Sequence, residues 1–150
     1  MQTAFLPPLV LPLLLPGTPV PSDETPLAHA VNSGMVTLAG QSTGGHNDKC
    51  LTVELVNRTD HPVRTVVPAG WLMQNSDPEA QDLMIVDRIP VELPPRGSWS
   101  VACKAYCVES SDRSPTAGTA LRSMGLAQPV WVRLAEHLVK DGVASDDAQA

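Results

Sequence analysis

Three cysteines are the residues of this sequence whose chemistry could define the protein. Cys103 and Cys107 lie four positions apart in the segment WSVACKAYCVES, and Cys50 is the only other cysteine. Cysteines form disulfides, bind metals or act as nucleophiles, and buried cysteines also fill apolar cores. Which of these uses is open to them depends on the elements that hold them.

Residues 98–108 repeat with a period of two, which predicts a β-strand. Residues four apart in a strand are separated by about 13 Å, whereas a disulfide requires Cα atoms within about 7 Å. We therefore expect Cys103 and Cys107 to share a face without bonding to each other. Cys50 opens another expected strand and could form a disulfide with either of them, which would leave one thiol free. The alternative is three reduced cysteines that are buried as small apolar residues.

A metal site is the third possibility for these cysteines. His46 precedes Cys50 by four residues and would complete a Cys3His set. No C-x2-C knuckle is present, and ligands four apart on one strand are too distant to meet at a tetrahedral zinc ion. A loop with Asp77, Glu79 and Asp82 lacks the regular ligand spacing of calcium loops. We expect no metal and no cofactor.

Catalytic motifs are absent from the sequence. It contains no nucleophile elbow, no phosphate-binding glycine loop and no H-E-x-x-H helix, and its four histidines are scattered. We predict no catalytic residues and conclude that the protein is not an enzyme.

Charge and composition limit the classes of molecule that this protein is expected to bind. The formal charge is −6 and the sequence pI is about 5.0, so nucleic acid and anionic membrane surfaces are poor partners. Fifteen prolines in 150 residues favour short strands and loops over a helical bundle. The remaining candidate is another protein, including a second copy of this chain.

The body of the chain reads as a series of short strands that are separated by turn-forming residues. This pattern predicts a mainly β protein with an antiparallel sandwich fold, followed by a helical part in which residues 119–127 form a short helix and residues 129–142 a longer one. The expected strands cover residues 34–40, 50–57, 62–68, 83–93 (one strand or two) and 98–108. The expected divisions are 34–112 for the sandwich, 113–142 for a helical lid and 143–150 for a disordered acidic tail.

Residues 1–33 form an apolar, proline-rich N-terminal part. The stretch FLPPLVLPLLLPGTPVPS is too short and too interrupted by proline to span a membrane as a helix. Its length suits a secretory signal, which predicts a secreted or cell-envelope protein, although the basic start is missing and the A-x-A triplet Ala28-His29-Ala30 lies far past the apolar stretch. The alternative is a mature arm in an extended, polyproline-like conformation that reaches a neighbouring subunit.

Longer stretches carry a resemblance. The segments STGGHNDKCLTVELVNRTDHPVRTVVPAGW, DPEAQDLMIV and VELPPRGSWSVACKAYCVESSDRSP resemble an uncharacterised family of bacterial secreted or envelope domains. The resemblance covers about residues 34–118. It implies an immunoglobulin-like β-sandwich and assigns no activity.

Several of these motif residues have a physical role that the structure can test. Gly70 and Gly97 suit turns that need positive φ. Gln81 and Asp82 precede an apolar strand and can bond the backbone of their loop. The sequon that begins at Asn57 is interpreted as a turn.

A second resemblance concerns covalent binding. The segments AYCV and AQPVWV resemble the cysteine and glutamine motifs of thioester adhesin domains, which implies a thioester between Cys107 and Gln128, with Tyr106 and Trp131 excluding water. Two functions therefore stand side by side. One is a non-catalytic extracellular or envelope subunit that binds or assembles, and the other is a covalent adhesin-like domain.

Overall fold

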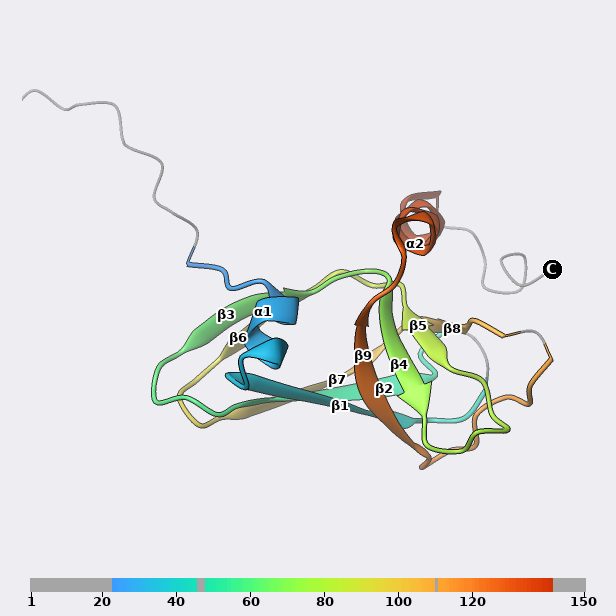
Figure 1. The fold of residues 1–150 in the computed structure, drawn as a ribbon, viewed down its shortest axis with the longest axis horizontal. Coiled ribbons are helices and arrows are strands. Elements are labelled where there is room, and N and C mark those ends of the chain that lie inside the picture. Colours follow the sequence, from blue (N-terminus) through green and yellow to red (C-terminus); the bar gives the residue numbers. More distant parts are fainter. Residues whose placement is uncertain (1–22, 46–47, 110, 142–150) are drawn as a thin grey trace, which may run out of the picture.

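The fold is mainly antiparallel β-structure with a helix at each end of the described chain (Figure 1). The computed structural model describes residues 23–45, 48–109 and 111–141. The predicted fold class, an antiparallel β-sandwich with a short C-terminal helix, is confirmed. The elements are α1 (Leu27–Asn32), β1 (Val36–Ser42), β2 (Leu51–Asn57), β3 (Val63–Val67), β4 (Trp71–Asn75), β5 (Leu83–Ile85), β6 (Ile89–Leu93), β7 (Ser98–Cys103), β8 (Ala105–Cys107), β9 (Ala120–Leu126) and α2 (Pro129–Asp141).

Seven strands form one sheet, in the order β7-β2-β1-β9-β4-β5-β8. Its two outermost strands, β7 and β8, are consecutive in the sequence and are separated only by Lys104. The sheet therefore curls until its ends meet, and strands β1 and β2 run across β4 and β9 (Figure 1). The backbone N–H of Ala105 donates to the carbonyl of Asp48 at 3.0 Å, which joins β8 to the residues before β2. We call this junction the seam.

Strands β3 and β6, which are not consecutive in the chain, form a separate two-stranded antiparallel sheet, from the Val63–Leu93 pair to the Val67–Ile89 pair. Helix α1 lies between this small sheet and β1 (Figure 1). Leu27 and Ala30 of the helix are buried in the same core cluster as the inward residues of the small sheet. The small sheet and the helix together cover the open side of the curled sheet.

Alternation places the apolar side chains of each strand in the core. Leu51, Val53 and Leu55 of β2 are fully buried, while Thr52 and Glu54 between them are not. The same period holds in β3 and β4, where Trp71 and Met73 are the largest buried side chains. The period of two read from the sequence therefore identifies the core-facing residues of β2 and β3 correctly.

The segment that we expected to form a short helix at 119–127 is strand β9. It pairs with β1 on one side and with β4 on the other, so it is a central strand of the sheet. Both neighbours satisfy its backbone hydrogen bonds, and this outweighs the weak helical spacing of its apolar residues. The division at residue 112 is therefore wrong, because the sheet extends to Leu126 and only Pro129–Asp141 is helical.

Two other strand predictions need correction. Residues 98–108 form two strands, because Lys104 interrupts the pairing and its N–H donates to the Asp87 carboxylate at 2.7 Å. β7 pairs with β2, whereas β8 pairs with β5. The segment 71–75 lies outside every predicted strand, yet it is the buried strand β4. Residues 83–93 form two strands, β5 and β6, which is one of the two alternatives that the pattern allows.

The N-terminal part contains a helix that the sequence analysis did not predict. Ala28-His29-Ala30 lies within α1, and Ala30 is fully buried. Cleavage after this triplet would remove part of the folded core. Residues 1–22, which carry the signal or arm prediction, lie outside the described residues, as do His46 and the tail at 143–150.

The turn predictions hold in part. Gly70 has φ of 85°, as predicted, but in the β6–β7 turn Arg96 holds the positive φ of 55° and Gly97 does not. Glycine is required at position 97 because the backbone there passes so close to Pro94 that a Cβ would clash with Pro94 Cγ. The sequon that begins at Asn57 is a turn, as predicted, because the Asn57 side chain bonds the residues that follow it. Asn57 is buried, so its amide is enclosed by protein.

Candidate functional site

The three cysteines gather around the seam. The Cys50 thiol donates to the carbonyl oxygen of Ala105 at 3.2 Å, and Ala105 lies midway between Cys103 and Cys107 in the chain. Cys103 is opposite Leu51 in the β2–β7 ladder, and its thiol donates to the Leu51 carbonyl at 3.6 Å. Cys50 therefore neighbours both of the cysteines with which it was predicted to pair.

All three cysteines are free thiols, so neither the Cys50–Cys103 nor the Cys50–Cys107 disulfide is formed in this structure. Cys50 and Cys103 are buried and Cys107 is half-buried. Burial raises the pKa of Cys103 to about 12 and that of Cys107 to about 11, and it also raises the pKa of Cys50. The neighbouring Cys50 thiolate would add to the pKa shift of the other two. A thiolate is the reactive form, so the raised pKa values make these thiols slow to react at neutral pH.

Metal-binding geometry is not found in the described part of the chain, where no three His, Cys, Asp or Glu side chains are arranged to hold an ion. His46, the candidate zinc ligand, lies outside it. The carboxylates of the 77–82 loop have partners other than a metal. Asp77 accepts a bond from Arg113 at 2.5 Å, and Asp82 accepts one from the Asn75 N–H at 2.8 Å.

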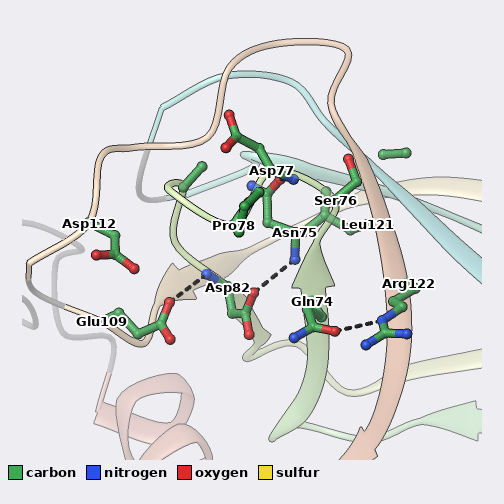
Figure 2. A pocket seen from close by; sticks show the side chains of 12 residues that line it. Gln74, Asn75, Ser76, Asp77, Pro78, Asp82, Glu109, Asp112, Leu121 and Arg122 are labelled. Carbon is green, nitrogen blue, oxygen red and sulfur yellow. Dashed lines mark hydrogen bonds between the residues drawn. The ribbon is translucent and has the colours of Figure 1, made fainter.

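A cavity of about 580 Å³ opens where β4 and β9 meet the loop at 76–82 (Figure 2). Asp82 is bonded on two sides, since its carboxylate accepts the Asn75 N–H and its own N–H donates to Glu109 Oε2 at 3.1 Å. Figure 2 also shows the Arg122 guanidinium donating to Gln74 Oε1, at 2.6 Å, across β4 and β9.

These contacts assign a structural role to the polar wall of the cavity. Asp82 bonds the backbone of its own loop, as predicted, because its carboxylate accepts the Asn75 N–H. Gln81 instead bonds the backbone of another loop, since its Nε2 donates to the Asp112 carbonyl at 2.6 Å. The Asp77 carboxylate has a lowered pKa, because the Glu79 N–H and then Arg113 stabilise its charged form. A lowered pKa is the opposite of what a general acid needs, so Asp77 is not suited to that role.

The predicted thioester residues are not brought together. Cys107 packs against the main core inside the curled sheet, together with Ala105. Tyr106 between them points to the opposite face, where it belongs to a second apolar cluster with Ala127 and Ala135 of the α2 region. Gln128 follows Ala127 of that second cluster and is exposed next to the start of α2.

The remaining feature is an exposed apolar surface on β9 and α2. Helical spacing places the apolar residues of α2 on one wide face, and the sheet covers only the part that includes Val132, Ala135 and Leu138. The rest of that face is open to solvent. The β9–α2 apolar surface consists of Met124, Leu126, Val130, Trp131 and Leu134, which are 41–56% exposed.

The sequence pattern does not predict this surface. It places Met124 and Leu126 in a short helix, and it places the apolar residues of α2 in a helical lid. Trp131 was named only as a water-excluding neighbour of the thioester. One feature of the sequence does indicate this surface: the apolar face of α2 is wider than contact with one sheet requires.

Comparison with known proteins gives no match: no family model, curated protein or solved structure resembles this chain significantly. Neither helix of the described residues is long and apolar enough to cross a membrane.

Proposed function

We propose that this protein is a non-catalytic assembly subunit whose β9–α2 apolar surface binds the N-terminal apolar segment of a second copy. The observation that carries the proposal is the exposure of five large apolar side chains on one strand and the helix that follows it. Exposed apolar side chains that are grouped on a folded domain often mark an interaction site, whereas singly scattered ones do not. Trp and Met are also among the residues enriched at protein interfaces.

The occupant is argued from chemistry. Residues 5–21 are rich in leucine and proline, and no charged side chain occurs among residues 1–22. Proline-rich segments lose little conformational entropy on binding and dock on surfaces that present aromatic rings. Trp131 supplies such a ring, at 45% exposure. Two copies of a chain with a net charge of −6 repel each other in general, so an uncharged segment is the part best suited to approach.

The direction of the chain favours binding to a second copy over binding within one copy. Glu24 forms a parallel bridge with Arg64 of β3, and the Thr25 N–H donates to the Arg64 carbonyl at 2.8 Å. β3 leads toward α2, because a Cβ on Gly70 shortly after this strand would lie 2.8 Å from Val132. The described chain therefore begins at the end of β3 that lies away from α2, as the blue end of the ribbon in Figure 1 also shows.

The test uses full-length protein and size-exclusion chromatography with light scattering over a range of concentrations. The arm variant carries Leu13→Asp and Leu14→Asp, and the surface variant carries Trp131→Lys and Leu134→Lys. Arg133→Ala on the polar side of α2 is the matched control. We expect wild type and control to associate and both variants to be monomeric, with unchanged circular dichroism.

Mixing the two variants makes the test specific. The arm variant keeps the surface and the surface variant keeps the arm, so an equimolar mixture should form a heterodimer through one intact contact. A mixture that stays monomeric would overturn the pairing of arm and surface. Wild-type protein that is monomeric at every concentration would overturn the assembly function itself.

A secreted or cell-envelope location is part of the proposal, supported by the apolar stretch before Gly17, which has the length of a secretory signal core. The mass of the protein isolated from its native source separates the two uses of this segment. The mass of the full chain would support the arm. Loss of residues 1–22 would support export by signal cleavage and would overturn the arm as the occupant.

A further inference from the structure

We infer that Cys107 and Cys50 form a thiol–disulfide exchange site, at which a small disulfide oxidises Cys107 and Cys50 then completes an internal bridge across the seam. This inference does not depend on the β9–α2 apolar surface. It identifies a redox form of the protein that differs from the free-thiol form described above.

The geometry at the seam places the two residues near each other. The Cys50 thiol bonds the carbonyl oxygen of Ala105, while the N–H of Ala105 bonds Asp48, so the residues before β2 flank the start of β8. Cys107 lies two positions beyond Ala105 and shares its face of β8. Residues two apart in a strand are separated by about 7 Å. Cys107 therefore lies about that far along β8 from the residue that Cys50 contacts, and forming the bond requires the segment before β2 to shift toward Cys107.

Accessibility decides which cysteine reacts first. Cys107 is half-buried, whereas Cys50 is 1% exposed and Cys103 is 0% exposed. An external oxidant can reach only Cys107. Cys103 is also tied to its own ladder, since its thiol donates to the Leu51 carbonyl. Cys50 is thus the internal thiol that can displace a small thiol bound to Cys107, and Cys103 takes no part in the exchange.

The chemistry balances with a small-molecule disulfide as oxidant. The Cys107 thiol loses its proton, and the thiolate attacks one sulfur of the disulfide and releases a small thiolate. Cys50 then loses its proton and attacks Cys107 Sγ, which forms the Cys50–Cys107 bond and releases the second small thiolate. The two protein thiols are oxidised, and one disulfide is reduced to two thiols. The raised pKa of Cys107, about 11, makes the first step slow at neutral pH and faster in mild alkali.

The bridge would fasten the seam. It links the start of β2 to β8, two elements that are far apart in the sequence and that meet only where the curled sheet closes. Closing a loop of this length removes conformational freedom from the unfolded chain. We expect the oxidised protein to melt about 10 °C above the reduced protein.

The experiment incubates full-length protein with oxidised glutathione at mildly alkaline pH and follows mass, melting temperature and peptide maps without reductant. The oxidised wild type should lack only its two thiol hydrogens and should yield a Cys50–Cys107 peptide pair. Cys50→Ala should instead keep one glutathione on Cys107. Cys103→Ala, the matched control in the same cluster, should form the bridge as wild type does.

Three results would overturn the inference. The first is a bridge that contains Cys103, and the second is a glutathione adduct on Cys107 that persists in wild type. The third is an unreacted Cys107 under conditions that oxidise a guanidine-unfolded sample. Since each readout concerns covalent state, none of them depends on whether the protein assembles.

Discussion

The indole N–H of Trp71 donates a hydrogen bond to the Ser123 hydroxyl at 2.9 Å, which links β4 to β9. Trp71 is 2% exposed and is the largest fully enclosed side chain of the core. These are the two strands that the sequence pattern did not identify. Their contact therefore offers a direct test of the observed sheet.

Ser123→Ala removes the acceptor and leaves the Trp71 N–H without its partner. We expect a loss of about 1–3 kcal/mol in the free energy of unfolding, because a buried donor without an acceptor keeps its full desolvation cost. Urea unfolding followed by tryptophan fluorescence measures this loss. Ser100→Ala, on an outward-facing position of β7, serves as the control and should cost much less. Equal effects of the two substitutions would contradict the β4–β9 pairing.

Asn57 holds the turn that follows β2. Its side-chain amide donates to the carbonyls of His61 at 2.7 Å and Pro94 at 3.0 Å, and its oxygen accepts from the Thr59 N–H at 2.9 Å. The substitution Asn57→Asp would place a carboxylate against these carbonyls. We expect a loss of about 3 kcal/mol or more in the free energy of unfolding, whereas Arg58→Ala beside it should change little. If the Asn57→Asp protein keeps wild-type stability in chemical denaturation, the turn is held differently.

Gly70 and Gly118 form a matched pair, since both have φ of 85°. A Cβ at position 70 would lie 2.8 Å from Val132 Cγ2 of α2, whereas a Cβ at position 118 meets nothing within 4 Å. Gly118→Ala should cost about 1 kcal/mol from backbone strain alone. Gly70→Ala should cost about 1–3 kcal/mol more, because it also displaces the helix. Hydrogen exchange should show faster opening of α2 amides only in the Gly70→Ala protein, and equal exchange in both would contradict the contact.

The buried thiols predict a loss of stability in alkali. The pKa of Cys103 rises to about 12 and that of Cys107 to about 11 in the folded protein, above an ordinary value of 9.0. The folded state thus keeps these protons after the unfolded chain has released them. Their contribution is fully present below pH 9 and falls as pH rises toward 11–12, by at most about 1.4 kcal/mol per pH unit for each thiol.

Urea unfolding at several pH values under reducing conditions measures this slope. Cys103→Ala removes one of the titrating thiols, so the decline above pH 9 should be shallower than in wild type. Parallel curves for the two proteins would show that Cys103 is ionised at its ordinary pH in the folded state.

The prediction for Cys103 and Cys107 agrees with the structure, although the single strand on which it was based does not exist. Cys103 and Cys107 were predicted not to bond because one continuous strand would hold them apart. They are unbonded, but Lys104 ends one strand and the chain resumes at the opposite end of the sheet. The alternation continues through the break, because inward residues on both strands face the same enclosed core.

The sequence alone determined the fold class, the strands around residues 51–57 and 63–67, the helix at 129–141 and the role of Asp82. Each of these depends on local periodicity, turn chemistry or a side chain that bonds its own loop. The tertiary structure decided that 120–126 is a central strand, that the sheet closes at Lys104 and that Cys50 sits beside β8. It also decided which half of the apolar face on α2 stays exposed. These features depend on partners distant in the chain, and a periodic pattern shows which side of an element is apolar but not what covers it.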